Sequence, residues 1–231
     1  MHVLASDPSR RGTEMTSHDE RFAGSGRIPR AVWIVVSLSV LPELILQGAD
    51  LDLWGRPGWR SVAYEYAGFW AGLLGDWRPN YTLQPILMFV TYGFLHAGIW
   101  HLVLNMTTLL ALTPPLVAQV GTGRFLALYG VSILGGAVGF AALTRATAPM
   151  VGASGALFGL VGALMSLDFR RRIDTGRPVA PLAGTALALI LGNALVWWAT
   201  NGRLAWETHL GGFLAGWIAA MAVPDRRADR A

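Results

Sequence analysis

Long apolar runs, separated by short polar or arginine-bearing segments, dominate the chain after residue 30. Six of these runs are close to the roughly 20 residues that an α-helix needs to cross the hydrocarbon core of a bilayer. The expected spans cover residues 31–47, 98–120, 124–144, 153–169, 181–199 and 206–223. The pattern therefore predicts an all-α membrane protein with one domain, a bundle of six transmembrane helices within residues 31–224.

Prolines and aromatic residues predict irregular stretches in this bundle. Pro42 should kink the first span, and Pro114 with Pro115 should bend or break the second span near its far end. The connection 48–84 mixes many aromatic residues with scattered charges. Aromatic rings with nearby charges suit the headgroup region of a membrane, so this connection should lie partly in the interface.

The two ends of the chain are polar and basic. Residues 1–30 hold five arginines and no apolar run, which predicts a disordered basic tail, and residues 225–231 should form a second short tail. With the amino end in the cytoplasm, thirteen arginines fall on inner segments and five on outer segments. Cytoplasmic loops carry the excess of positive charge, so both tails are expected in the cytoplasm, as in a bacterial inner membrane.

Composition narrows the function further. Only 14% of the residues are charged and 53% are hydrophobic, where soluble domains carry about 25% charged residues. The chain has no cysteine, which excludes disulfides and thiolate metal sites. Its arginines form no clustered basic stripe, so we expect no nucleic-acid partner.

A few polar side chains lie where apolar ones are expected. Ionisable groups within spans are costly and are usually functional. His96, His101 and His209 lie in or beside the predicted spans, and Ser154 begins the fourth. His101 and Asn105 are four residues apart, so they share a helix face and can both donate hydrogen bonds toward one point.

Small residues predict which helices pack together. Glycine faces allow two helix backbones to approach closely in a membrane. One such face lies on the fourth span and a matching face on the sixth, where it follows His209 at helical spacing. The glycines are Gly155, Gly159 and Gly162 on the fourth span and Gly212 and Gly216 on the sixth. This packing is expected to bring His209 to Ser154.

A serine beside a histidine suggests nucleophilic catalysis. A serine hydroxyl is a weak nucleophile until an adjacent base takes its proton, and His209 is the candidate base. Attack on a peptide carbonyl creates an oxyanion, for which His101, Asn105 and the backbone N–H of Ser154 are candidate donors. No acidic residue shares the face of His209, so we expect a Ser–His dyad without a third member.

These motifs resemble those of the rhomboid family of intramembrane serine proteases. The matching motifs are His96-x4-His101-x3-Asn105, Gly152-x-Ser154-Gly155 and His209-x2-Gly212-x3-Gly216. The resemblance covers residues 31–224. It implies Ser154 as nucleophile, His209 as base, oxyanion support from His101 and Asn105, and membrane-spanning proteins as substrates.

The chain departs from the family pattern at two informative places. Leu87-Met88 stands where many members have a Trp-Arg pair. Phe158 follows the serine by one turn where many members have tyrosine; it can still stack on the base but offers no hydroxyl. His96 lies off the face of His101, and we expect it to have a structural role in tying the first loop down.

Three alternatives remain at the level of sequence. The first is that the histidines are metal ligands, but no acidic or thiol partner shares their faces, and we expect neither metal nor cofactor. A non-catalytic relative could bind transmembrane helices through the same groove. A small-solute transporter should show charges within spans or a repeat of broken helices, and the chain shows no clear internal repeat.

Overall fold

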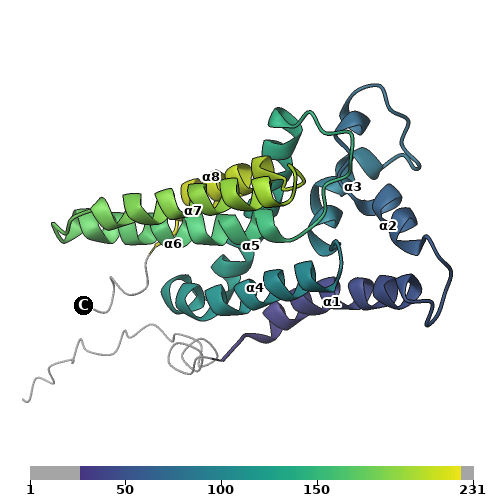
Figure 1. Cartoon of the computed structure of the whole chain (residues 1–231). Helices are drawn as coiled ribbons and strands as arrows, with labels where there is room; N and C mark the ends of the chain where they lie inside the picture. Colours follow the sequence, from purple (N-terminus) through teal and green to yellow (C-terminus); the bar gives the residue numbers. More distant parts are fainter. Residues whose placement is uncertain (1–26, 225–231) are drawn as a thin grey trace, which may run out of the picture.

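A computed structural model describes residues 27–224. The regular secondary structure of this range is helical, apart from one isolated β-bridge. Figure 1 shows the arrangement. The elements are α1 (Arg30–Asp50), α2 (Trp59–Ala67), η2 (Ala71–Leu74), α3 (Gln84–Thr91), η3 (Tyr92–Phe94), α4 (Ile99–Val120), α5 (Thr122–Leu143), α6 (Ser154–Asp174), α7 (Ala180–Ala199) and α8 (Trp206–Met221). The predictions for most of the first tail and for the second tail concern residues outside this range.

Four helices are long and apolar enough to cross a membrane: α1, α4, α5 and α7. The helices α6 and α8 form where spans were predicted, but they do not meet the same measure of length and composition. The end of α6 carries Asp168, Asp174 and the arginines between them, and α8 has 16 residues. The all-helical prediction is confirmed, whereas the count of six spans is not settled by helix length.

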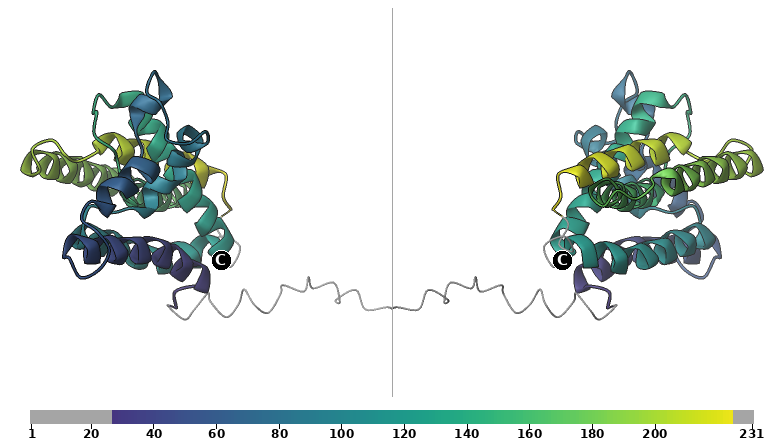
Figure 2. Two further views of the ribbon diagram at one scale, coloured as in Figure 1. Left: turned by 90° about the vertical axis from the view of Figure 1, so that its right-hand side faces the viewer. Right: turned by 90° about the vertical axis from the view of Figure 1, so that its left-hand side faces the viewer.

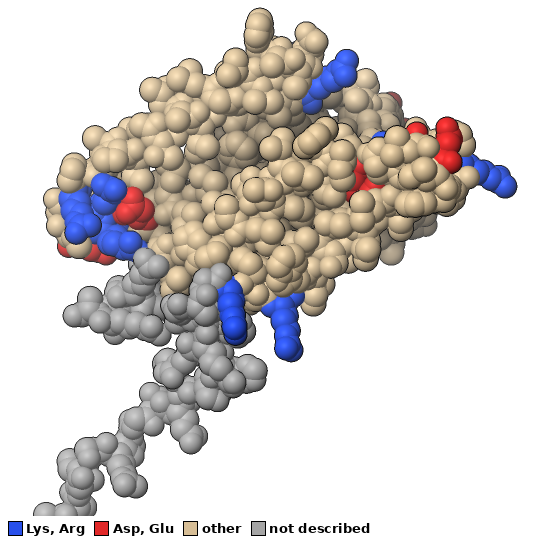
Figure 3. Space-filling model, turned by 60° about the horizontal axis from the view of Figure 1, so that its bottom comes forward, with Lys and Arg blue, Asp and Glu red and all other residues tan. Residues whose placement is uncertain are grey.

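The charged surface agrees with a membrane setting. In the face drawn in Figure 3, most charged side chains lie around the rim of the molecule, and a broad uncharged surface lies inside that rim. Many large apolar side chains are exposed along the helices, such as Ile34, Trp100 and Ile190, each more than 60% exposed. Lipid tails would cover such side chains in a bilayer.

Two expected irregularities differ in the structure. The helix α1 continues through Pro42, and α4 continues through Pro114 and Pro115 to Val120, so the predicted break in the second span is wrong. A proline removes one backbone hydrogen bond from a helix. The helix can still continue past it when packing against neighbouring helices and the hydrogen bonds of adjacent turns compensate for the loss. The connection 48–84 contains two short helices, α2 and η2, where only an irregular loop was expected.

The helix α8 packs against both α5 and α6 through glycine. A Cβ atom at Gly212 would meet the backbone of Gly155, and one at Gly216 would meet that of Gly159. On the other side, Gly139 of α5 has no room for a Cβ because it faces the backbone of Gly211. In lipid, the hydrophobic effect does not drive helices together, so van der Waals packing between close backbones stabilises the contact. This packing fixes the position of α8 relative to α6.

A buried ion pair joins α1 to α2. Two nitrogens of Arg60 each lie 2.8 Å from a different carboxylate oxygen of Glu43, whose side chain is 0% exposed. Burial lowers the pKa of the Arg60 guanidinium, but hydrogen bonds to Glu43, Tyr64 and Asp50 outweigh it and hold the pKa above its ordinary value. The same guanidinium and the Tyr64 hydroxyl donate to the carbonyl of His96. This network ties the start of the α4 region to the first loop.

Arg60→Met should lower the free energy of unfolding by about 3–5 kcal/mol, because it leaves the Glu43 carboxylate buried without a partner. Thermal unfolding in detergent would measure the change. The double variant Glu43→Gln/Arg60→Met should recover part of the loss. Asp168→Asn removes the charge from the partly exposed pair with Arg172 and should cost at most about 1 kcal/mol. Equal losses from Arg60→Met and Asp168→Asn would contradict a structural role for the buried pair.

Candidate active site

Ser154 is the first residue of α6 and is placed by the loop before it. Gly152 has a φ of +125°, which L side chains rarely adopt, and a Cβ there would also collide with the ring of His101. The N–H of Gly152 donates to the carbonyl of Tyr92, 3.0 Å away, and Met150 pairs with Phe69 of the first loop. The first backbone N–H groups of a helix lack partners within that helix. The Ser154 hydroxyl therefore lies beside available amide donors.

His209 of α8 reaches Ser154 across the glycine contact. Its Nε2 lies 2.8 Å from the Ser154 Oγ, within hydrogen-bond distance. The ring of Phe158 stacks on the imidazole, with ring centroids 4.2 Å apart and planes 8° apart. The structure thus brings together the serine, the histidine, the stacking ring and the glycines that the sequence singled out.

The other imidazole nitrogen contacts a residue that sequence reasoning missed. Asn193 of α7 places its Oδ1 2.6 Å from the Nδ1 of His209. The sequence search for a third member considered only acidic residues on the helix of His209. A search for uncharged polar residues within the other predicted spans would have found Asn193, since amides inside spans are also uncommon.

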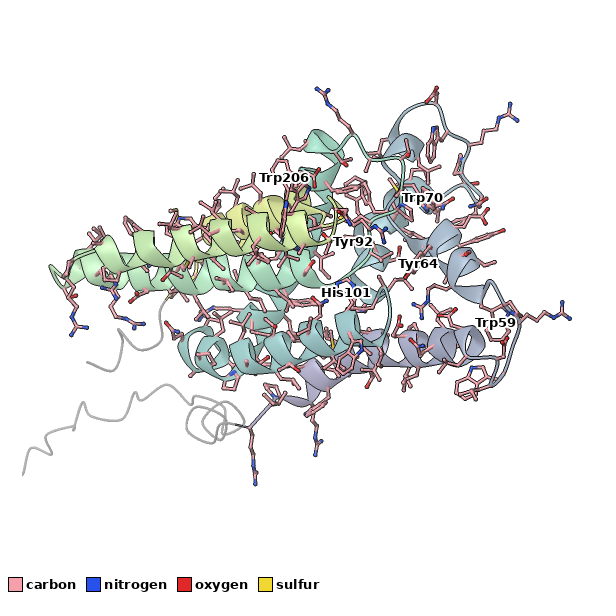
Figure 4. The ribbon with its side chains drawn as sticks, in the orientation of Figure 1. Trp59, Tyr64, Trp70, Tyr92, His101 and Trp206 are labelled. Atoms are coloured by element: carbon pink, nitrogen blue, oxygen red, sulfur yellow. The ribbon has the colours of Figure 1, made fainter. Side chains whose placement is uncertain are left out.

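His101 lies against the serine loop in a defined orientation. Its Nδ1 accepts a hydrogen bond from the N–H of Ala97 at 3.2 Å. A neutral imidazole then carries its proton on Nε2, and the Cε1–Nε2 edge of the ring is the part that adjoins Gly152. Figure 4 shows His101 near the middle of the molecule. The Nε2–H of His101 is therefore an available donor beside Gly152, which precedes Ser154 by two residues.

Asn105 and His96 are held close by. The side-chain amide of Asn105 donates to the carbonyl of His101 at 2.8 Å, which leaves a second amide hydrogen for another acceptor. His96 is fully buried, and its ring packs edge-on against that of His101, with centroids 5.2 Å apart. Its backbone carbonyl accepts the hydrogen bonds from Arg60 and Tyr64.

An apolar groove reaches His209 and Asn193. It has a volume of about 510 Å³ and lies among α6, α7 and α8. His209 and Asn193 are its main polar residues, and the rest of the lining is apolar and aromatic. The lining residues are Phe158, Ala186, Leu189, Ile190, Asn193, Ala194, Trp197, Trp206, His209, Leu210, Phe213 and Leu214. An extended or partly unwound apolar segment would fit such a groove.

Residues 27–224 hold no group of three histidine, cysteine, aspartate or glutamate side chains close enough to bind a metal ion. The site chemistry available in the described residues is therefore that of a hydroxyl, imidazoles and amides. A hydroxyl hydrogen-bonded to an imidazole, with nearby N–H donors, can perform acyl transfer.

Comparisons with known proteins agree on one family. A family model described as the rhomboid domain matches residues 84–226. YdcA of Bacillus subtilis, whose name refers to the rhomboid proteases, is 30% identical over 160 residues, which are 68% of this chain and 72% of that protein. Rhomboid protein 1, mitochondrial, of Saccharomyces cerevisiae is 32% identical over 152 residues, 60% of this chain and 43% of that protein.

A further relative, Rhomboid protease GluP of Bacillus subtilis, is 31% identical over 149 residues, which are 64% of this chain and 26% of that protein. The matched region is thus most of YdcA but less than half of the yeast protein and of GluP. The relatives come from both bacterial and mitochondrial settings.

Proposed function

The chain belongs to the rhomboid family, and from that membership we propose that it is an intramembrane serine endopeptidase. The observation that carries the proposal is the 2.8 Å contact between the Ser154 Oγ and the His209 Nε2. A packing serine would not need a buried imidazole held at this distance by glycine-to-glycine helix contact. Both residues also occur at the positions that the family motifs require.

In the proposed reaction, the Ser154 Oγ attacks the carbonyl carbon of a peptide bond while His209 Nε2 takes the hydroxyl proton. The resulting oxyanion accepts hydrogen bonds from the Nε2–H of His101, the backbone N–H of Ser154 and the free amide hydrogen of Asn105. His209 then gives its proton to the leaving amine, and an acyl-enzyme remains. A water molecule, deprotonated by His209, attacks the ester carbon; the bond to the Ser154 Oγ then breaks, His209 returns the proton to this oxygen, and the second product leaves as a carboxylic acid.

The proposed substrates are membrane-spanning proteins. The groove among α6, α7 and α8 is lined mostly by apolar side chains, and His209 of the proposed dyad is one of its lining residues. A substrate helix that unwinds near its outer end could place its backbone there, since unpaired backbone groups at membrane depth are tolerated only inside protein or beside water. A small residue before the cut bond would ease this approach.

For topology, we propose that α6 and α8 cross the membrane together with α1, α4, α5 and α7. Both ends of the chain would then lie in the cytoplasm. The start of α6, with Ser154, would lie toward the outer side of a bacterial cell membrane. The arginines at the end of α6 support this orientation, because Arg170, Arg171 and Arg172 would lie on the cytoplasmic side.

A serine-directed phosphonate tests the proposal. Purified protein should be labelled at Ser154, because His209 activates this hydroxyl and no other serine of residues 27–224 is hydrogen-bonded to a histidine side chain. Mass spectrometry of proteolytic fragments would locate the label. Unlabelled folded protein would favour the alternative, a catalytically inactive rhomboid relative that binds transmembrane helices in the same groove. Labelling at another serine would also contradict the proposal.

A further inference from the structure

Among the described helices of 16 or more residues, α7 is the one without a buried residue. Figure 2 shows α7, in light green, standing out from the side of the molecule. Yet α7 carries Asn193, whose side chain contacts His209. Within residues 27–224, this is the one side-chain hydrogen bond that the structure shows between α7 and another helix.

The orientation of the Asn193 amide is defined by a second contact. Its Nδ2 donates to the carbonyl of Leu189, 3.1 Å away in the preceding turn. The Oδ1 therefore faces the Nδ1 of His209, and because an amide oxygen can only accept, Nδ1 must carry the proton. The lone pair of a neutral imidazole is then on Nε2, 2.8 Å from the Ser154 hydroxyl. This is the tautomer that a general base requires.

We propose that Asn193 is a positioning residue that completes a Ser154–His209–Asn193 arrangement and that α7 must be seated against α8 for catalysis. The inference rests on the proposed function. When His209 takes the serine proton, its Nδ1–H remains bonded to the Asn193 Oδ1, whose partial negative charge stabilises the imidazolium. No proton passes to Asn193. An amide serves better than a carboxylate at this depth because it carries no charge to desolvate.

The contact geometry favours a positioning role for Asn193 over a simple tether between α7 and α8. A bond that only fastened α7 to α8 would not need the amide orientation set by Leu189, nor a histidine fixed on its other two sides by Phe158 and Ser154. The ring of His209 has three neighbours that together define its position: Phe158 on its face, Ser154 at Nε2 and Asn193 at Nδ1. Any displacement of α7 removes the third.

The kinetic test compares three variants on α7. Asn193→Leu keeps the volume but removes the acceptor, and should lower kcat by about 10²-fold, as expected when a catalytic group loses its alignment, with KM within about twofold. Asn193→Asp restores an acceptor and should recover most of kcat. Thr185→Ala, on the same helix but outside the groove, bonds only within α7 and should behave as wild type.

Two results would overturn the inference. The first is that Asn193→Leu keeps the wild-type kcat, with or without a change in KM, although the wild-type protein is labelled by the phosphonate. Wild-type protein that is folded but unlabelled would instead overturn the proposed function, and with it any catalytic part for Asn193.

The tautomer can be observed without activity. In ¹⁵N-histidine-labelled protein, the nitrogen shifts of His209, assigned by comparison with His209→Gln, should show a protonated Nδ1 and an unprotonated Nε2. Asn193→Leu should shift this population toward the other tautomer, and Thr185→Ala should not. A dominant Nε2–H tautomer in the wild type is the second result that would overturn the inference, since it would place the proton on the wrong nitrogen.

Discussion

Ser154→Ala should abolish cleavage of a model single-span substrate, and His209→Ala should do the same. Losing either member of a nucleophile–base pair removes the covalent route, and in serine proteases such losses are on the order of 10⁴ to 10⁶-fold in kcat. Because the two residues act as one unit, the double variant should be no less active than either single variant. The measurement is the appearance of cleaved substrate in liposomes containing purified enzyme.

Ser166→Ala provides the matched control for this prediction. Ser166 lies on the same helix α6, is fully buried, and its hydroxyl has no hydrogen-bond partner in the structure. Removing that hydroxyl should leave cleavage unchanged, since a buried group without a partner stabilises nothing. All variants should unfold near the wild-type temperature. Full activity in Ser154→Ala or in His209→Ala would rule out the proposed mechanism.

Gly212→Ala should reduce activity by about 10²-fold or more, although residue 212 touches no reacting atom. Its new methyl group would meet the backbone of Gly155, one residue after the nucleophile, and backbone cannot rotate away as a side chain can. The helices α6 and α8 must therefore separate, which pulls His209 from Ser154. A misplacement of about 1 Å in a catalytic group is enough for a loss of this size.

Gly130→Ala tests whether the effect belongs to the helix contact. Gly130 lies within α5, and a Cβ there would meet nothing within 4 Å. Alanine is the better helix former by roughly 0.5–1 kcal/mol, so this variant should be as stable as the wild type or slightly more stable, with full activity. The two quantities to compare are the unfolding temperature and the cleavage rate. Equal rates in Gly212→Ala and Gly130→Ala would contradict close glycine packing as the device that aligns the dyad.

Several parts of the fold could be predicted because they depend on residues close together in the chain. The boundaries expected for the second, third and fifth spans lie within a few residues of α4, α5 and α7, since apolar length and turn residues act locally. The pairing of α6 with α8 followed from glycines repeating at helical spacing. The expectation at Pro114 and Pro115 was a bend or a break, and the break does not occur, because the packing around a helix decides whether a proline breaks it.

The sequence alone determined that the chain is helical and membrane-bound, and it supplied Ser154, His209 and the glycine faces, because these are properties of single helices and of short motifs. Only the tertiary structure decided which residue contacts the Nδ1 of His209 and which residue pairs with the buried Glu43. Asn193 reaches His209 from a different helix, and Arg60 reaches Glu43 from the far side of a loop. Such contacts depend on how whole helices tilt and pack, which no local pattern of residues encodes.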